Sequence, residues 1–220
     1  MSSPTAEIRA ADELAGALAG LEARAGLILV GGADFTDRAL RAALRGFFAI
    51  VARHCDRTGT AVVDGGTDSG VMRLMAEERT ALAGSFPLIG VVPRGALDRR
   101  TRTGGPIELA RDHTLVLLVP GSRFGDETDL LFAAADVLAG AGAPAPALVV
   151  NGGALARREA ERRLAAGGVV VAVEGSGRAA DELAASLATD EGLRASGRLR
   201  TIPIGVDEAG LAAALEGVGT

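Results

Sequence analysis

Lysine, tryptophan and tyrosine are absent from this chain of 220 residues, and phenylalanine occurs only six times. All 23 basic residues are therefore arginine. The lack of lysine excludes a Walker A phosphate loop and Schiff-base chemistry, because both need a lysine amine. The scarcity of aromatic residues leaves no stacking platform for single-stranded nucleic acid, and the net charge of −5 argues against non-specific binding to its backbone.

Motifs for metal binding and redox chemistry are also missing. Cys55 is the single cysteine and lies in a predicted helix, so we interpret it as a small buried apolar residue. His54 and His113 belong to no His/Cys cluster, and no acidic run has the spacing of a calcium loop. The sequence therefore predicts no bound metal and no cofactor.

Long apolar runs are lacking as well. No stretch approaches the length of a membrane span, and the N-terminus has no signal-peptide pattern. We therefore expect a soluble cytoplasmic protein with neither a membrane span nor a nucleic-acid partner. Because no charged or Pro/Ser-rich linker divides the chain, residues 1–220 are expected to form a single domain.

What the sequence does contain is a repeated alternation of apolar runs and helical patterns. Helical periodicity follows nearly every run, and most runs end in glycine. Strands that alternate with helices predict a doubly wound α/β fold with a mostly parallel sheet of about six or seven strands. The runs suited to buried parallel strands span residues 27–30, 60–63, 87–92, 114–119, 146–150 and 169–173.

Three further segments flank or interrupt this pattern. Apolar residues at helical spacing predict an N-terminal helix over residues 6–23. Residues 200–217 are predicted to form an edge strand and a closing helix, since Pro203 is tolerated only at an edge or a strand end. The arginine-rich segment 94–111 is either a basic lid over the site or a solvated loop.

The strongest single motif is the glycine turn at residues 64–70, where an apolar strand runs into an amphipathic helix. Gly65 and Gly66 can adopt backbone angles that other residues avoid, and they let a ligand approach the main chain. The helix that follows presents unpaired N–H groups and a partial positive charge, which favour a phosphate. The alternative is a tight turn in which Gly65 and Gly66 serve packing alone.

Similar turns follow the other strands, and ligands of doubly wound sheets bind beyond the carboxyl ends of the strands, where the strand order reverses. We interpret Gly175–Arg178 as a second phosphate-binding turn; the alternative is that Arg178 is a solvated first-turn residue. Residues 151–153 are interpreted as a contact to a base or a ribose, or alternatively as a simple turn. The candidate ligand-binding residues are Gly31, Gly32, Gly65, Gly66, Thr67, Asp68, Ser69, Gly70, Pro93, Gly121, Gly125, Glu127, Asn151, Gly152, Gly153, Gly175, Ser176, Gly177 and Arg178.

Five segments, at residues 64–72, 88–93, 112–114, 125–127 and 174–181, resemble motifs of the SLOG superfamily in the same order. More narrowly, the chain resembles the prokaryotic LSDAT branch, which is related to the N-terminal cytosolic region of melastatin-type (TRPM) channels. The resemblance spans roughly residues 27–187. It implies a Rossmann-like three-layer αβα sandwich with a pocket for nucleotides or nucleotide-derived ligands, such as the ADP-ribose-type ligands of some channel relatives.

More distant LOG-type relatives are phosphoribohydrolases, which cut nucleoside 5′-monophosphates into a base and ribose 5-phosphate. Their first signature, Gly-Gly-Gly-x-x-Gly-Leu-Met-Gly, is largely kept here, with Thr67 in place of the third glycine and Arg73 in place of the last. The matching residues are Gly65, Gly66, Ser69, Gly70 and Met72. The resemblance thus implies a phosphate-binding role for this turn.

The second LOG signature, Pro-Gly-Gly-x-Gly-Thr-x-x-Glu, is poorly kept at residues 120–129. With one inserted residue, Asp129 falls at the position of the catalytic glutamate, and Gly125-Asp126 replaces the Gly-Thr pair. Glu127 is interpreted as a contact to a ribose or a base, or alternatively as a first-turn charge favoured by the helix dipole. If the protein is a hydrolase, Glu127 and Asp129 are its candidate catalytic residues.

Three hypotheses follow. We favour a sensor or binding module for a nucleotide-derived small molecule, namely an ADP-ribose- or NAD-like ligand or an adenine nucleotide. A nucleoside 5′-monophosphate phosphoribohydrolase is the alternative, and it needs a carboxylate beside the ribosyl cation. A structural or oligomerisation module is the third, and a homodimer is compatible with each of them.

Overall fold

The computed structural model describes residues 3–32, 37–100, 105–142 and 144–216. In chain order, the elements are β1 (Thr5–Glu7), the 3-10 helix η1 (Ala11–Glu13), α1 (Leu14–Ala17), β2 (Ala25–Gly31), α2 (Arg38–Thr58), β3 (Thr60–Asp64), α3 (Gly70–Leu82), β4 (Leu88–Pro93), the 3-10 helix η2 (Arg94–Ala96), β5 (Leu115–Val119), α4 (Thr128–Ala139), β6 (Ala147–Val150), α5 (Ala154–Ala165), β7 (Val170–Glu174), α6 (Arg178–Thr189), α7 (Glu191–Ser196), β8 (Leu199–Pro203) and α8 (Glu208–Leu215).

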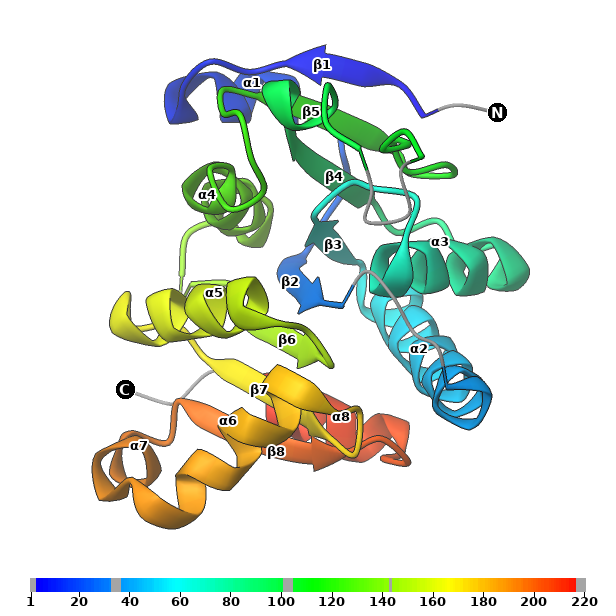
Figure 1. Ribbon diagram of the computed structural model, residues 1–220. Coiled ribbons are helices and arrows are strands. Elements are labelled where there is room, and N and C mark those ends of the chain that lie inside the picture. Colours follow the sequence, from blue (N-terminus) through cyan, green and yellow to red (C-terminus); the bar gives the residue numbers. More distant parts are fainter. Residues whose placement is uncertain (1–2, 33–36, 101–104, 143, 217–220) are drawn as a thin grey trace.

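The strands form one eight-stranded sheet in the order β1-β5-β4-β3-β2-β6-β7-β8. Every pair of neighbours is parallel. The chain proceeds from β2 outward to β5, returns to β6 beside β2, and then continues outward to β8, as Figure 1 shows. The order therefore reverses between β2 and β6. The predicted α/β fold with a parallel sheet is confirmed, and each of the six predicted strands lies within a residue or two of an observed one.

The two ends of the chain add the outermost strands. β8 and α8 occur where the sequence predicts a strand and a helix. At the N-terminus, β1, η1 and α1 replace the helix predicted for residues 6–23, so that prediction is wrong. Ile8, Leu14 and Leu18 are buried as expected, but Gly16 and Gly20 lie within this segment and disfavour a continuous helix. A strand as short as β1 gives no detectable alternation in sequence.

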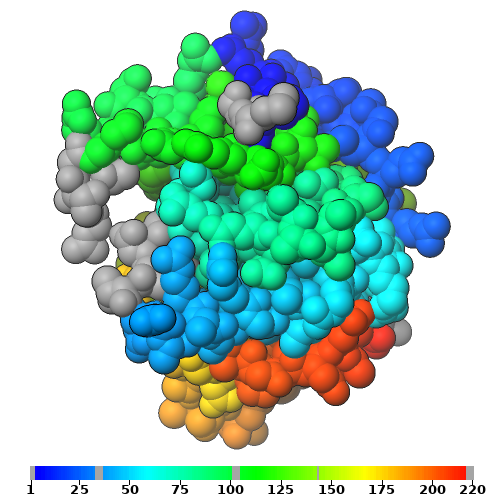
Figure 2. All heavy atoms as spheres, turned by 90° about the vertical axis from the view of Figure 1, so that its right-hand side faces the viewer, coloured from blue at the N-terminus to red at the C-terminus, as the bar shows by residue number. Residues whose placement is uncertain are grey.

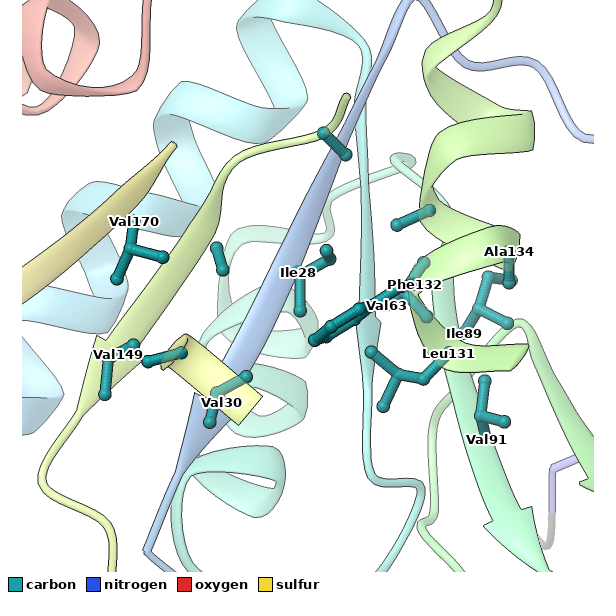
Figure 3. Packing of buried hydrophobic residues seen from close by; sticks show 14 of the residues in the cluster. Ile28, Val30, Val63, Ile89, Val91, Leu131, Phe132, Ala134, Val149 and Val170 are labelled. Atoms are coloured by element: carbon teal, nitrogen blue, oxygen red, sulfur yellow. The ribbon is translucent and has the colours of Figure 1, made fainter. Parts of the chain in front are cut away.

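Helices cover both faces of the sheet, giving three layers. One core cluster contains residues of α1, α4, α5 and α6 packed on the sheet, and Figure 3 shows part of it around Ile28, Val63 and Phe132. The other contains residues of α2, α3 and α8, and Figure 2 is turned toward the side on which these helices lie. Both faces of the central strands are thus buried, which explains why they are continuous apolar runs. Among the described residues, no helix combines the length and apolar character needed to cross a membrane.

Candidate functional site

The carboxyl ends of β2 and β6 meet at the point where the strand order reverses, with Gly31 opposite Val150. The backbone here is too close for side chains on the β2 side. A Cβ atom at Gly31 would lie 2.5 Å from the Val150 carbonyl oxygen, and one at Gly32 would lie 2.6 Å from Oδ1 of Asn151. These two glycines therefore permit the close approach of the two strand ends. We call the edge formed by the carboxyl ends of the strands the rim.

The β3–α3 loop begins with a turn that only glycine accommodates easily. Gly66 has φ +63°, and a Cβ atom there would lie 2.4 Å from Cγ2 of Val92. Its amide donates to Oδ1 of Asp64 over 2.8 Å. Gly65, by contrast, would place a Cβ atom in open space. The turn is therefore held tightly against β4 at Gly66 and is open at Gly65.

A buried ion pair lies at the base of this turn. Nε2 of His113 is 3.1 Å from both carboxylate oxygens of Asp64, and neither side chain is exposed. Nδ1 of His113 lies 3.3 Å from the Arg111 carbonyl oxygen, so both ring nitrogens face acceptors and the geometry suits an imidazolium. Burial alone would lower the pKa of His113, but the Asp64 carboxylate outweighs it and the pKa is raised.

Part of the arginine-rich segment packs against the same loop. Leu109 forms an antiparallel bridge with Thr67. The amide of Asp68 donates to the Glu108 carbonyl over 2.9 Å, and the amide of Ala110 donates to the Gly66 carbonyl over 2.8 Å. Residues 108–110 therefore behave as a short extra strand along the loop. Residues 101–104 of the segment lie outside the described residues.

The arginines of that segment differ in their partners. Arg94 pairs with Glu7, and Arg111 pairs with Asp68 and Glu108. All these pairs are partly exposed to solvent. A role as a basic lid remains a prediction.

The N-terminus of α3 has backbone amides without partners among the described residues. Ser69 precedes the helix but makes no side-chain capping bond, because its hydroxyl instead lies 2.9 Å from that of Thr67. The amide of Val71 donates to the Gly32 carbonyl over 3.0 Å. The amides of Gly70 and Met72 have no partner within the part of the chain that the structure describes. This helix end therefore offers free N–H groups and the positive end of its dipole.

The β6–α5 and β7–α6 loops are joined to each other. The hydroxyl of Ser176 is fully buried, accepts from the Asn151 amide over 2.8 Å and donates to the Val173 carbonyl over 2.6 Å. Nδ2 of Asn151 donates to the Ser176 carbonyl over 2.6 Å. The Ser176 hydroxyl thus lies beneath the rim with its partners inside the protein, and its predicted phosphate contact has no support in this arrangement.

The first turn of α6 is also occupied by the neighbouring loop. The amide of Ala180 donates to the Asn151 carbonyl over 3.0 Å, and that of Ala179 donates to the Gly152 carbonyl over 3.3 Å. Two amides of the first turn of α6, next to the predicted phosphate-binding turn, are therefore used to join the loops.

Arg178 remains available at this position. Its side chain is exposed and makes no hydrogen bond or ion pair with any described residue. A Cβ atom at Gly153 would lie 2.8 Å from Nη2 of Arg178, so the guanidinium sits at the start of α5, not of its own helix. The amides of Ala154, Leu155 and Ala156 have no partner in the described part of the chain. Arg178 and the N-terminus of α5 therefore face the same space with positive charge.

The β5–α4 loop meets α5 from the other side. A Cβ atom at Gly125 would lie 2.9 Å from Cδ1 of Leu155. Glu127 is 3% exposed, and its Oε2 accepts from the Gly125 amide over 2.6 Å. Burial, more than any other cause, raises the pKa of Glu127. Its carboxylate therefore folds back onto its own loop.

A second buried carboxyl group, that of Glu159 on α5, lies next to this loop. Glu159 is 8% exposed, and its Oε1 lies 3.2 Å from the Thr128 hydroxyl. Burial, together with the negative charge of Glu127, raises its pKa to about 7. Glu159 was not predictable as a site residue, because it lies in the polar run Arg157–Arg162, which is typical of a solvated helix face.

Asp129 is placed differently from Glu127. Its side chain is 79% exposed and pairs with Arg162. The structure thus does not bring the two candidate catalytic carboxylates together. At the other side of the loop, a Cβ atom at Gly121 would lie 2.9 Å from Cβ of Pro93, so these two predicted rim residues are neighbours.

Asp64 and His113 were also outside the predicted site, although Asp64 is a charged residue at the end of an apolar strand and could have been noticed for that reason. No group of three or more His, Cys, Asp or Glu side chains suited to a metal ion occurs among the described residues.

The fold and rim define a Rossmann-like α/β domain in which, among the described residues, amides at the starts of α3 and α5 are unpaired near the strand-order reversal. The family model for the prokaryotic SLOG domain in TRPM matches residues 24–213, and the chain belongs to this family. The resemblance inferred from the motifs is therefore confirmed. A search of curated proteins gave no significant match.

Two solved structures have a similar fold. The first is described as TM1055, a structural-genomics target, with 19% identity, a TM-score of 0.59 and coverage of 86% of this chain and 97% of that chain. The second is the molybdenum cofactor binding protein from the phototrophic bacterium Rippkaea orientalis, with 12% identity, a TM-score of 0.56 and coverage of 86% and 94%.

Proposed function

We propose that this protein is a cytoplasmic binding module or sensor for a nucleotide-derived ligand, which binds at the rim between the ends of β2, β3 and β6. The observation that carries the proposal is the arrangement around the strand-order reversal. Among the described residues, amides at the starts of α3 and α5 have no partner. The guanidinium of Arg178, which also has no described partner, lies beside Gly153 at the start of α5. Such an arrangement suits a phosphate-bearing ligand.

The two helix ends would contact the ligand through different groups. The turn before α3 offers backbone amides alone, whereas the start of α5 combines amides with a guanidinium that can bind a phosphate in a bidentate manner. A ligand with more than one phosphate, such as ADP-ribose or an NAD-like dinucleotide, would engage both. Family membership and a structural neighbour described as a cofactor-binding protein support small-molecule binding.

The proposal is tested by calorimetry and thermal shift with ADP-ribose, NAD, AMP and ATP. We expect at least one of them to raise the melting temperature, because a ligand that binds only the folded state stabilises it. Arg178→Ala should weaken that ligand by roughly 1.5 to 3 kcal/mol, the scale of a hydrogen bond to a charged group. Arg53→Ala, which removes an exposed arginine in the middle of α2, is the matched control. The proposal is refuted if no ligand of the panel produces either binding heat or a shift of the melting temperature.

Phosphoribohydrolase activity is the second candidate, favoured by the raised pKa values of the buried carboxyl groups Glu127 and Glu159 beside the rim. We nevertheless favour binding without turnover, since Asp129 is exposed and paired with Arg162. Incubation with AMP should then release neither adenine nor ribose 5-phosphate. Release that disappears in Glu127→Gln would establish the hydrolase, whereas Asp129→Asn should leave any release unchanged.

The homodimer stays a prediction, which light scattering of the purified protein can test.

A further inference from the structure

The hydroxyl of Thr128 lies between two acceptors in the interior beside the β5–α4 loop. It is 3.0 Å from the Gly125 carbonyl oxygen and 3.2 Å from Oε1 of Glu159. A hydroxyl has a single proton to donate, and a carbonyl oxygen has none. One proton forms only one full hydrogen bond, so both contacts reach full strength when the Glu159 carboxyl group is protonated and donates to the Thr128 oxygen; the alternative is a Thr128 proton shared between the two acceptors.

We propose that Glu159 is a proton-carrying positioning residue: its protonated carboxyl group donates to Thr128, whose hydroxyl donates to the Gly125 carbonyl and thereby fixes the β5–α4 loop at the rim. Loss of this proton reverses the first bond. The Glu159 carboxylate then competes for the Thr128 proton, and the Gly125 carbonyl loses its donor.

The surrounding charges place this change near neutral pH. Glu127, at the start of α4, faces Glu159 with a like charge, whereas Arg158 and Arg162 of α5 act in the opposite direction. Arg162 is partly neutralised by its pair with Asp129 of α4. Burial and Glu127 prevail, so the pKa of Glu159 is raised to about 7. The two buried carboxyl groups titrate as a pair, because ionising one raises the cost of ionising the other.

The ionisation of Glu159 also affects a second hydrogen bond of the loop, the one between the Gly125 amide and the Glu127 carboxylate. Glu127 accepts from the Gly125 amide over 2.6 Å, so Gly125 is held through its N–H by one carboxyl group and through its carbonyl by the other, the latter by way of Thr128. A second negative charge next to Glu127 disfavours its buried carboxylate. The amide of Gly125 therefore reports directly on the protonation state of the pair.

The test is an NMR titration of the ligand-free protein between pH 5 and pH 8.5. The side-chain carboxyl carbon of Glu159 should titrate with a midpoint near pH 7, and the amide resonance of Gly125 should shift with the same midpoint. In Glu159→Gln, whose amide group donates as the protonated acid does, the Gly125 amide should show no such step. Glu161→Gln removes an exposed carboxylate from the same helix and should leave the step unchanged.

Two substitutions of Thr128 separate positioning from simple packing. Thr128→Val keeps the shape but removes the hydroxyl. Glu159 should still titrate and the Gly125 amide should keep the part of its step that comes through Glu127, but the Gly125 carbonyl carbon should lose its step near pH 7. Thr128→Ser keeps the hydroxyl and should restore it. The inference is overturned if Glu159 titrates near its ordinary value of 4.5, or if the Gly125 step persists in Glu159→Gln. Since no ligand is present, the outcome does not depend on the proposed function.

Discussion

The β3–α3 loop and the β7–α6 loop both follow a buried strand and both contain glycines, yet they use their backbone amides in opposite ways. In the first loop, the amides of Gly70 and Met72 are free of partners among the described residues. In the second, the amides of Ala179 and Ala180 donate to carbonyls of the β6–α5 loop. One glycine turn therefore presents backbone, whereas the other presents the side chain of Arg178.

The two loops also differ in how they are held. The first rests on the buried ion pair of Asp64 and His113, which lies below it. The second rests on neutral hydrogen bonds between Ser176 and Asn151. A buried charged pair is costly to break because the remaining charge has no partner, whereas a neutral bond is cheaper to lose. Substitutions at the base of the first loop should therefore have the larger effects.

His113→Ala should give the largest loss. We expect the free energy of unfolding to fall by about 3 to 5 kcal/mol near pH 6, since the Asp64 carboxylate would be left buried and unpaired. The raised pKa of His113 means that its contribution is fully present below about pH 6.5 and is lost as the pH rises through the folded-state pKa. The difference between wild type and variant in urea unfolding should therefore shrink at higher pH.

His54→Ala is the matched control for this experiment. His54 is also buried, but its Nδ1 has no hydrogen-bond partner in the described structure, and burial lowers its pKa. Its contribution therefore has the opposite pH dependence and is lost as the pH falls below about 6.5. Equal pH profiles for the two variants would show that His113 is not charged in the folded protein.

Gly66→Ala should follow. A left-handed residue with a side chain costs about 1 to 2 kcal/mol, and overpacking against Val92 adds about 1 to 3 kcal/mol, so we expect a loss of roughly 2 to 5 kcal/mol. Gly65→Ala, whose Cβ atom would lie in open space, should change stability by no more than about 0.5 kcal/mol. Urea unfolding of both variants measures the contrast, and similar losses would contradict the tight fit at Gly66.

The sheet was predictable because its central strands are buried on both faces. Runs such as Pro87–Val92 carry no polar residue, and their glycine ends mark where each strand stops. β1 was not predictable, since three residues are too few for a pattern and its pairing with β5 depends on contacts distant in sequence.

The sequence predicts where the site lies, at the carboxyl ends of the parallel strands, but it does not predict which groups of the site are hydrogen-bonded to one another. Parallel strands bring their carboxyl ends together, so the glycine turns had to be neighbours. Which amides stay free depends on distant carbonyls, such as that of Asn151 accepting from Ala180. The burial of Glu159 depends on the packing of α5 against α4, which its polar sequence neighbours conceal.

Ser176→Ala should have a smaller effect on stability than Gly66→Ala. It leaves the Asn151 amide without its acceptor in the interior, which costs about 1 to 3 kcal/mol. Because the hydroxyl is fully buried, ligand affinity measured below the melting transition should be unchanged. A loss of affinity without a loss of stability would instead establish the direct phosphate contact predicted from the sequence.

Arg178→Gly should change stability less than Ser176→Ala does, and in the opposite direction. Arg178 has φ +55°, a left-handed conformation that is unusual for a residue with a side chain. Glycine relieves this strain but gains freedom in the unfolded chain, so we expect a net stabilisation of up to about 1 kcal/mol. Arg178→Ala keeps a Cβ atom and therefore the strain, so its stability should stay near that of wild type. Both variants should bind nucleotide more weakly than wild type, as measured by calorimetry.

A strained residue that costs stability and improves binding is typical of a functional position. If Arg178→Gly is less stable than Arg178→Ala, the left-handed conformation at this position is wrong, and with it the placement of the guanidinium at the start of α5.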